Sequence, residues 1–395
     1  MPYRLSRRRR RVALLVETSN AYARGLLEGV VTYVRKHDPW SLDLPEMRRG
    51  EVPRGWLGRW RGDGIVARIE NAATARAVAS TKLPVVDVSA ARHLSHIPWV
   101  ETDDDAVARL AVEHFVERGF KQFAFCGDSR FNWSRWRCEH FVRRTSEFGA
   151  TCALFESRRT RRLRDDGDEA RRLRRWVTTL PKPIGILACY DIQAQRLLDA
   201  CRDVDVAVPE EVAVLGVDDD RLLCDLCSPP LSSIVPDAPQ AGYVAAELLD
   251  RMLRGEKVSA DEHRVPPRGV AARQSTDVLA VDDRAVATAV RFIRERACDD
   301  IRVDDVLARV PLSRRVLESR FYKLLGRTPH DEILRIKLER VKQLLAETDL
   351  KLEAVADRAG FRHVEYLSVV FKRVVGVPPS RWRRQATSRT PTRGG

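Results

Sequence analysis

The sequence has 395 residues, 44% of them hydrophobic, and a formal net charge of +14. A chain of this length is expected to form two or three domains with substantial cores. No run approaches the roughly twenty apolar residues of a membrane-spanning helix, and the apolar run after the basic N-terminal segment (1–11) is too short for a signal peptide. These features exclude membrane-spanning and secreted classes and predict a cytoplasmic protein.

The first 277 residues alternate between predicted strands and predicted helices. The apolar runs expected to be strands are 12–16, 64–69, 84–89, 122–127, 153–156, 185–190 and 212–220. The amphipathic stretches expected to be helices include 25–37, 70–80 and 106–119, and a further helix begins near Arg135. Apolar strands that alternate with helices are typical of parallel sheets covered on both faces. Because the pattern is longer than one such sheet needs, we expect two similar lobes.

Strand signals end after Asp277, and helix follows helix. We place a linker at 278–284, an all-α domain at 285–385 and a disordered polar tail at 386–395. Within the all-α domain, 303–326 and 352–383 each predict a short helix, a turn and a second helix. In the later unit Gly360 permits the turn. The buried stripes are expected to contain Val316, Leu317 and Phe321 in the earlier unit, and Leu352, Val355, Ala356, Ala359, Leu367, Val370, Phe371 and Val374 in the later one.

Two helix–turn–helix units in tandem indicate a DNA reader. Residues 285–395 contain 24 Lys and Arg against 14 Asp and Glu, and such a basic domain suits a polyanion whose phosphates supply much of the affinity. The charge alone could also reflect an arginine-rich surface that only contacts solvent. The two helix–turn–helix units favour DNA binding over this alternative. The expected partner is operator or promoter DNA.

Base contacts are expected from the first turns of the two recognition helices. The candidates in the first are Ser313, Arg314, Arg315, Glu318 and Ser319, and those in the second are His363, Glu365, Tyr366 and Val369. Arg315 would pair with guanine, Glu318 would accept from cytosine, and Tyr366 or Val369 would touch a thymine methyl. Phosphate contacts are expected from Arg362, Lys372, Arg373, Arg381 and Arg383. For any single residue, a solvated surface position is an equal alternative.

Motifs of common enzyme classes are missing. The sequence contains no P-loop, no G-x-G-x-x-G after its first strand, no zinc-spaced His pair and no nucleophile elbow. Eight cysteines are scattered, and Cys224 with Cys227 forms a C-x-x-C without a second pair. We therefore expect reduced thiols, no metal, no cofactor and no catalysis.

The last hundred residues resemble the AraC-type DNA-binding domain, which has seven helices and two helix–turn–helix units. The resemblance rests on Gly360-Phe361, Tyr366, Phe371-Lys372, Gly376, Pro379 and Trp382-Arg383, with Gly326, Thr328 and Pro329 closing the first unit. Leu367, Pro378 and Trp382 depart from the residues usual at their positions, and all three are compatible with packing.

Residues 12–277 resemble the sugar-binding core of LacI-type repressors, which is itself similar to periplasmic sugar-binding proteins. The matching stretches are 102–127, 183–201, 208–220 and 228–234. The usual N-terminal DNA-binding headpiece of that family is missing. A LacI-type core before an AraC-type reader is similar to the bacterial xylose-operon regulators. The combination implies an α/β two-lobed, periplasmic-binding-protein-like sensor followed by an all-α domain.

The resemblance places Arg137 at the sugar-gripping arginine of the core and Asp218 at its sugar-binding aspartate. Arg135 competes with Arg137 because the register of SRWR is open, and Asp218 has the alternative role of capping the next helix. Asn20, Tyr22 and Arg24 lie on the first strand–helix loop, where a ligand would be met. Asp191 follows a strand end and would either contact the sugar or cap a helix that begins at Ile192.

The resulting hypothesis is a sugar-controlled transcription activator. The resemblance implies D-xylose as the effector, a homodimer built through the sensor cores, and contact with RNA polymerase if the chain activates transcription. Arabinose, ribose and mannose stay open as effectors, as does repression. Two other classes compete with it: an α/β sugar-processing enzyme fused to a DNA reader, and a transport-type sugar-binding protein.

Overall fold

The computed structural model describes residues 9–49, 51, 55–157, 166–277 and 283–387. The chain forms two compact units, Met1–Asp277 and Val278–Gly395. Most of the predicted basic segment, linker and tail (1–8, 278–282 and 388–395) lies outside the described residues.

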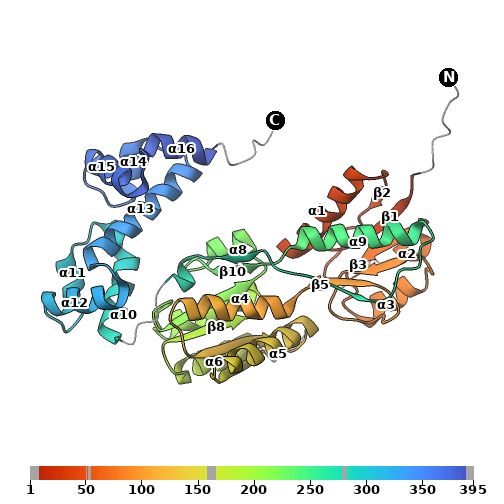
Figure 1. Ribbon diagram of the computed structural model, residues 1–395, viewed down its shortest axis with the longest axis horizontal. Helices are drawn as coiled ribbons and strands as arrows, with labels where there is room; N and C mark the ends of the chain where they lie inside the picture. Colours follow the sequence, from red (N-terminus) through yellow and green to blue (C-terminus); the bar gives the residue numbers. More distant parts are fainter. Residues whose placement is uncertain (1–8, 50, 52–54, 158–165, 278–282, 388–395) are drawn as a thin grey trace. The chain divides into compact units, whose positions relative to one another are not determined.

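The first unit contains two six-stranded sheets, each with helices on both faces (Figure 1). The first sheet has the order β11–β5–β4–β3–β1–β2, and all its neighbouring strands are parallel. Its strands are β1 (Arg11–Leu15), β2 (Ser41–Asp43), β3 (Gly64–Ala67), β4 (Val85–Asp87), β5 (Trp99–Thr102) and β11 (Glu262–Val265). Its helices are α1 (Ala21–Lys36), α2 (Trp56–Arg59), α3 (Ala72–Ala79) and α9 (Ala238–Leu253).

The apolar run of β1 is continuous because both faces of the first sheet are buried. Val12 and Leu14 pack into the cluster that includes α1 and α9, whereas Ala13 and Leu15 pack into the cluster on the opposite face. Successive side chains of a strand point to opposite faces, so each strand needs apolar residues at every position. This explains why no polar–apolar alternation marks the strand in the sequence.

Helices α1 and α9 approach each other so closely that glycine is required. A Cβ atom on Gly29 would lie 2.0 Å from the carbonyl oxygen of Pro239, and one on Gly242 would lie 1.9 Å from that of Leu26. Side-chain atoms never pack at such distances, so backbone meets backbone there. The contact joins residues some two hundred positions apart and holds α9 on the first lobe.

The second sheet has the order β12–β10–β9–β8–β6–β7, and β12 alone runs antiparallel to its neighbour. Its strands are β6 (Phe123–Asp128), β7 (Cys152–Ser157), β8 (Ile184–Ala188), β9 (Val212–Val217), β10 (Ser232–Val235) and β12 (Gly269–Ala271). Its helices are α4 (Asp104–Glu117), α5 (Asn132–Glu147), α6 (Asp166–Thr179), α7 (Asp191–Asp203) and α8 (Arg221–Leu226), and the 3-10 turn η1 (Gln274–Thr276) closes the unit. The predicted two-lobed α/β architecture is confirmed.

The chain crosses between the lobes three times, at 102–104, 235–238 and 265–269. Each crossing joins a strand of one sheet to an element of the other lobe. As a result, loops from the carboxyl ends of strands in both sheets face a common space. Ligands of open parallel sheets bind at such strand ends.

The second unit is helical in its described part, with seven α-helices. They are α10 (Arg284–Arg296), α11 (Val303–Leu307), α12 (Arg314–Leu325), α13 (Pro329–Glu347), α14 (Leu352–Arg358), α15 (Val364–Val375) and α16 (Pro379–Thr387), with the 3-10 turn η2 (Ala297–Asp299) after α10. Helices α11–α12 and α14–α15 are the two predicted helix–turn–helix units. Throughout the described ranges, no helix combines the length and the apolar character that crossing a membrane requires.

Two expectations about the buried stripes are wrong. Val316 is 37% exposed and Val374 is 59% exposed, whereas Leu317, Phe321, Leu367, Val370 and Phe371 are buried as predicted. Val316 lies one 100° step before Leu317 and so outside the apolar arc of α12, whereas Val374 has the spacing of a buried residue of α15 and is exposed all the same. In α15 the neighbouring Val375 packs on the core instead.

Candidate functional site

A cavity of about 360 Å³ lies between the two lobes of the first unit, and we call it the interlobe cavity. Its volume falls at the lower end of the roughly 300–1,000 Å³ typical of small-molecule sites. The residues that line it are Ser19, Asn20, Ala21, Tyr22, Arg49, Arg68, Glu101, Thr102, Trp133, Arg137, Tyr190, Asp191, Ile192, Asp218, Asp220 and Leu223. Five of the seven predicted sugar-contact residues are among them.

Arg137 reaches the interlobe cavity and Arg135 does not. Arg137 is 4% exposed, and its guanidinium donates to Asp104 Oδ1 at 2.8 Å and to the carbonyl oxygen of Cys189. Arg135 is exposed on the far side of α5 and donates to the amide oxygen of Asn132. Two residues along a helix are about 200° apart, so only one of the two arginines can face the cavity. The helix begins at Asn132, earlier than the sequence predicts.

Arg24 also lies outside the interlobe cavity. Its side chain is 47% exposed, with Nη2 3.7 Å from a carboxylate oxygen of Asp220 in the other lobe. Asn20 and Tyr22 from the same loop do line the cavity. Asn20 caps α1 by accepting from the Ala23 amide at 2.8 Å, and the Tyr22 hydroxyl donates to Glu101 at 3.2 Å.

The Asp218 carboxylate has no hydrogen bond or ion pair with any described residue. It follows β9 with a φ of +116°, a conformation that non-glycine residues rarely adopt and that recurs at binding sites. Burial raises its pKa to about 6, while the charges of Arg137, Arg49 and Arg68 pull the pKa back down. A half-buried carboxylate in this position is available to accept hydrogen bonds from a ligand.

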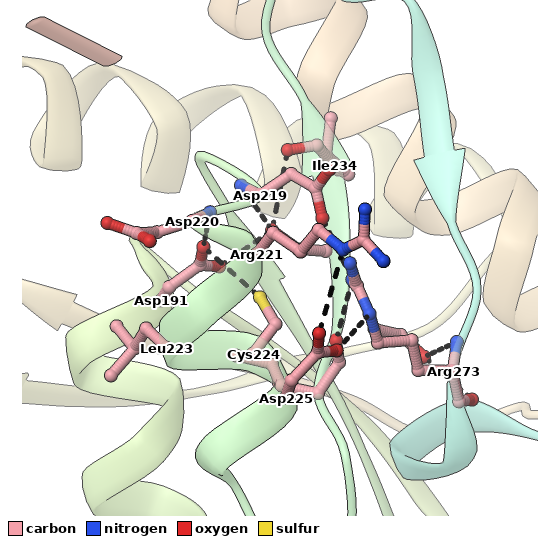
Figure 2. A network of polar contacts seen from close by, with 12 residues as sticks. Asp191, Asp219, Asp220, Arg221, Leu223, Cys224, Asp225, Ile234 and Arg273 are labelled. Carbon is pink, nitrogen blue, oxygen red and sulfur yellow. Dashed lines mark hydrogen bonds and ion pairs between the residues drawn. The ribbon is translucent and has the colours of Figure 1, made fainter. Parts of the chain in front are cut away.

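Asp191 holds the aspartate loop of residues 218–220 in place (Figure 2). Its carboxylate accepts from Ser233 Oγ at 2.6 Å, from the Asp220 amide at 2.8 Å and from Cys224 Sγ at 3.5 Å. Burial and the charge of Asp218 raise its pKa. The alternative that Asp191 caps a helix starting at Ile192 is wrong, since α7 begins at Asp191 itself. The cap residue of α8 is Asp220, so Asp218 does not have its alternative capping role either.

Aromatic rings form another wall of the interlobe cavity. The rings of Trp133 and Tyr190 lie 5.5 Å apart in an edge-to-face arrangement, and the Arg137 guanidinium lies 5.4 Å from the Trp133 ring centre. Across the lobes, Arg49 stacks on Phe131 at 4.6 Å. Such faces suit the CH groups of a sugar ring, while the polar side chains suit its hydroxyls.

The cations of the interlobe cavity are already paired. Arg68 lies 2.6 Å from Glu17 and 2.9 Å from Glu70, Arg49 lies 3.2 Å from Glu70, and Arg137 is held by Asp104. Burial lowers the pKa of Arg68, but the charges of Glu70, Glu17, Glu101 and Tyr22 together outweigh burial and raise it. Each arginine among the described residues that line the cavity already has a carboxylate partner, so the cavity fits a neutral polyhydroxyl ligand better than a phosphorylated one.

The first recognition helix, α12, exposes its predicted base-reading residues. Ser313, Arg314, Arg315 and Ser319 are exposed, and Glu318 is half-buried. Arg314 is engaged by Glu318 at 3.1 Å and by Asp304 at 3.3 Å. Within the described ranges Arg315 forms no hydrogen bond or ion pair, so its guanidinium is available to a base.

The second recognition helix, α15, likewise presents its predicted face to solvent. His363, Glu365, Lys372 and Arg373 are exposed, and so are the apolar surfaces of Tyr366 (49%) and Val369 (65%). Arg362 is exposed but ion-paired with Asp300. Arg381 is exposed, whereas Arg383 is half-buried and donates to the Leu350 carbonyl oxygen at 2.5 Å.

Known proteins match every part of this architecture. A XylR N-terminal domain matches residues 11–105, a periplasmic binding protein-like domain matches 112–276, and a helix-turn-helix domain matches 306–385. The xylose operon regulatory protein of Escherichia coli strain K12 is 32% identical over 385 residues, which cover 95% of this chain and 97% of that protein. The chain belongs to the family of xylose operon regulatory proteins.

Further comparisons agree with this family. The xylose operon regulatory protein of Haemophilus influenzae is 31% identical over 94% of this chain and 98% of its own length. The solved structure of the xylose-binding transcription activator xylR superposes with a TM-score of 0.83 at 32% identity, covering 95% of this chain and 98% of that one. Like these relatives, the chain is a sugar-responsive, DNA-binding transcription regulator with an AraC-type reader, and it is not an enzyme.

Sequence reasoning missed part of the sensor's cavity wall. Arg49, Arg68, Glu101 and Thr102 line the cavity although none was predicted. Arg68 follows the apolar strand run 64–67, and Glu101 interrupts the apolar run of β5. A charged residue within a strand buried on both faces was the signal that could have identified them. Arg49 lies in a loop with no such signal.

Proposed function

We propose that the chain activates pentose-catabolic genes in response to D-xylose bound in the interlobe cavity. The observation that carries this proposal is the unpaired Asp218 carboxylate, which faces a small cavity whose arginines are already neutralised. Asp218 would accept from sugar hydroxyls, Arg137 would donate to one, and Trp133 with Tyr190 would cover the apolar face of the ring. The names of the relatives supply the identity of the sugar.

A ligand that bridges both lobes would favour their closed arrangement. In a homodimer formed through the sensor domains (12–277), closure would reposition the two DNA-binding domains (285–385) at the far side of the linker (278–284). The ligand acts by binding better to the DNA-competent state than to the other. DNA-bound dimers would then contact RNA polymerase. Because the partner is DNA, we propose that the protein works in the cytoplasm.

Thermal unfolding with D-xylose, L-arabinose, D-ribose and D-mannose tests the effector. A ligand at about 100 times its Kd stabilises the folded state by about 2.7 kcal/mol. We expect an increase in Tm with D-xylose, no increase for D218N, and an unchanged increase for the matched control D219N, since Asp219 pairs with Arg273 at 2.8 Å and does not line the cavity. An increase with another sugar would replace the effector, and an increase retained by D218N would remove Asp218 from the site.

Operator binding tests the coupling between sugar and DNA. The affinity for a footprinted operator and the transcript yield with purified polymerase should both rise with D-xylose, and sedimentation should give a dimer. Equal affinity and equal transcript yield with and without saturating sugar would eliminate the proposed activation.

A further inference from the structure

Helix α13 connects the two helix–turn–helix units, and it is attached rigidly to the first. Glu332 on α13 is fully buried. Its carboxylate accepts from Arg335 at 2.8 Å on the same helix, lies 2.5 Å from Arg327 in the loop after α12, and lies 3.9 Å from Arg294 of α10. Three elements therefore meet at one buried charge. Breaking such a cluster leaves uncompensated charge in the interior, so the end of α13 near Glu332 moves with α10 and with the loop after α12.

The turn of the second helix–turn–helix unit is packed directly against the backbone of η2. Gly360 ends the turn after α14 with a φ of +74°, and a Cβ atom there would lie 2.5 Å from the carbonyl oxygen of Cys298. The Lys337 side chain, which projects from α13 and is 8% exposed, donates to the Gly360 carbonyl oxygen at 2.6 Å. The turn that leads into the second recognition helix thus touches both η2 and α13.

Asp300 completes this junction. It lies just after η2 in the left-handed conformation, with a φ of +58°. Its carboxylate forms an ion pair with Arg362, two residues before α15 begins, and lies 3.6 Å from Lys337 Nζ. The Asp300 carboxylate therefore contacts both the connecting helix α13 and the turn of the second helix–turn–helix unit. A cavity of about 420 Å³ borders the same junction, and its lining includes Asp300, Lys337 and Arg362.

We propose that Asp300 and Lys337 are positioning residues that fix the distance and rotation of α15 relative to α12. Asp300 ties the residue after η2 to Arg362, and Lys337 ties α13 to the Gly360 carbonyl oxygen, so the two side chains hold the turn from two directions. The protein would consequently bind DNA only when the bases contacted by α12 and the bases contacted by α15 are separated by one set number of base pairs. We call these two groups of bases the base clusters. Arg362, predicted as a phosphate contact, is in this view held as part of the junction.

The experiment uses the full chain and a duplex selected from a randomised pool by the unmodified protein. Footprinting locates the two base clusters, and one or two base pairs are then inserted between them. Each insertion moves the second cluster by about 3.4 Å and about a tenth of a turn. The measured quantity is the spacing penalty, the Kd for an inserted duplex divided by the Kd for the selected one.

The variants are D300N and K337M, and the matched control is D299N. Asparagine tolerates the left-handed conformation, so D300N is expected to fold. Asp299 is adjacent and pairs with Arg296 at 3.0 Å without reaching the second helix–turn–helix unit. We expect a spacing penalty of at least about tenfold for the unmodified protein and for D299N, since one helix loses its bases. In D300N and K337M we expect a weaker affinity for the selected duplex and a penalty of about threefold or less.

Three results would overturn the proposal. The first is an unchanged spacing penalty in both D300N and K337M. The second is a loss of affinity that is equal at all spacings, which would assign the two residues to stability or to direct DNA contact alone. The third is a penalty near one in the unmodified protein. Thermal unfolding of each variant confirms that the compared proteins are folded.

Discussion

The amide nitrogen of Asp220 lies 2.8 Å from the Asp191 carboxylate, so a residue at the start of α7 sets the path of the loop after β9. The same carboxylate accepts from Ser233 on β10 and from Cys224 on α8. Asp218 keeps its unusual backbone conformation because both ends of its loop are held. The cavity-facing Asp218 therefore depends on a neighbour that itself lines the cavity.

Replacing Asp191 by alanine should lower both stability and sugar affinity. The substitution leaves buried donors without an acceptor, which costs about 1–3 kcal/mol for each unpaired group. We expect a decrease of about 3 kcal/mol in the free energy of unfolding measured in urea. The control D199A removes an exposed aspartate of the same helix, paired with Arg202 at 2.6 Å, and should change it by less than about 1 kcal/mol.

Sugar affinity should depend on pH through Asp218. In the proposed complex the ionised carboxylate accepts hydrogen bonds from sugar hydroxyls, so protonation below its pKa of about 6 should remove acceptors and weaken binding. We expect a D-xylose affinity that is constant well above pH 6 and falls by up to about tenfold per unit well below it. Calorimetry in buffers of different ionisation enthalpy should show proton release on binding near pH 6.

The folding stability of the ligand-free protein should change with pH in the opposite direction to the sugar affinity. Folding raises the pKa of Asp218 from 3.8 to about 6. Its contribution to stability is therefore full below pH 3.8 and is lost as the pH rises through about 6. In D218N both effects should disappear, and a pH profile of binding identical to that of the unmodified protein would refute the assignment.

Arg137 should matter to folding as well as to the ligand. Its side chain and that of Asp104 are each 5% exposed, so R137M leaves a buried carboxylate without its cation. We expect a loss of about 3–5 kcal/mol in unfolding free energy together with loss of sugar binding. The double variant D104L/R137M should recover part of the stability without the binding.

The matched control for this prediction is R143M on the same helix. Arg143 is 54% exposed and pairs with Asp105 at 2.6 Å, so its removal should cost less than about 1 kcal/mol. Equal destabilisation by R137M and R143M would show that the buried pair carries no special weight.

Arg315 is expected to read a guanine. Its guanidinium is exposed and forms no hydrogen bond or ion pair within the described part of the chain. R315A should reduce the discrimination between the selected duplex and one with that guanine replaced by about 1–3 kcal/mol. The control R320A, whose arginine pairs with Asp283 at 3.0 Å, should leave base discrimination intact. If R315A discriminates between bases at every position of the duplex as well as the unmodified protein does, Arg315 does not read a guanine.

The sequence supports predictions where function depends on local order. Asp218 follows an apolar strand, Arg137 lies at a fixed offset from Phe141, and the two helix–turn–helix units are continuous stretches. Glu101 and Arg68 behave differently, because they meet only through the strand order β5–β4–β3 of a parallel sheet. Strand order is a tertiary property, so no local pattern reveals which charged residues it brings together.

The edges of apolar helical faces are also hard to predict. Val374 follows Val370 by four residues, which is the spacing of a buried stripe, yet it is exposed, and Val316 lies one 100° step from the buried Leu317.

The three crossings between the lobes bear on how the protein is synthesised. Helix α9 and strand β11 belong to the first lobe, but they follow the strands β6 to β10 of the second. A nascent chain therefore cannot complete its first lobe until most of the second has left the ribosome. The early part must wait with the apolar face that α9 later covers still open, a period in which chaperone binding or aggregation competes with folding.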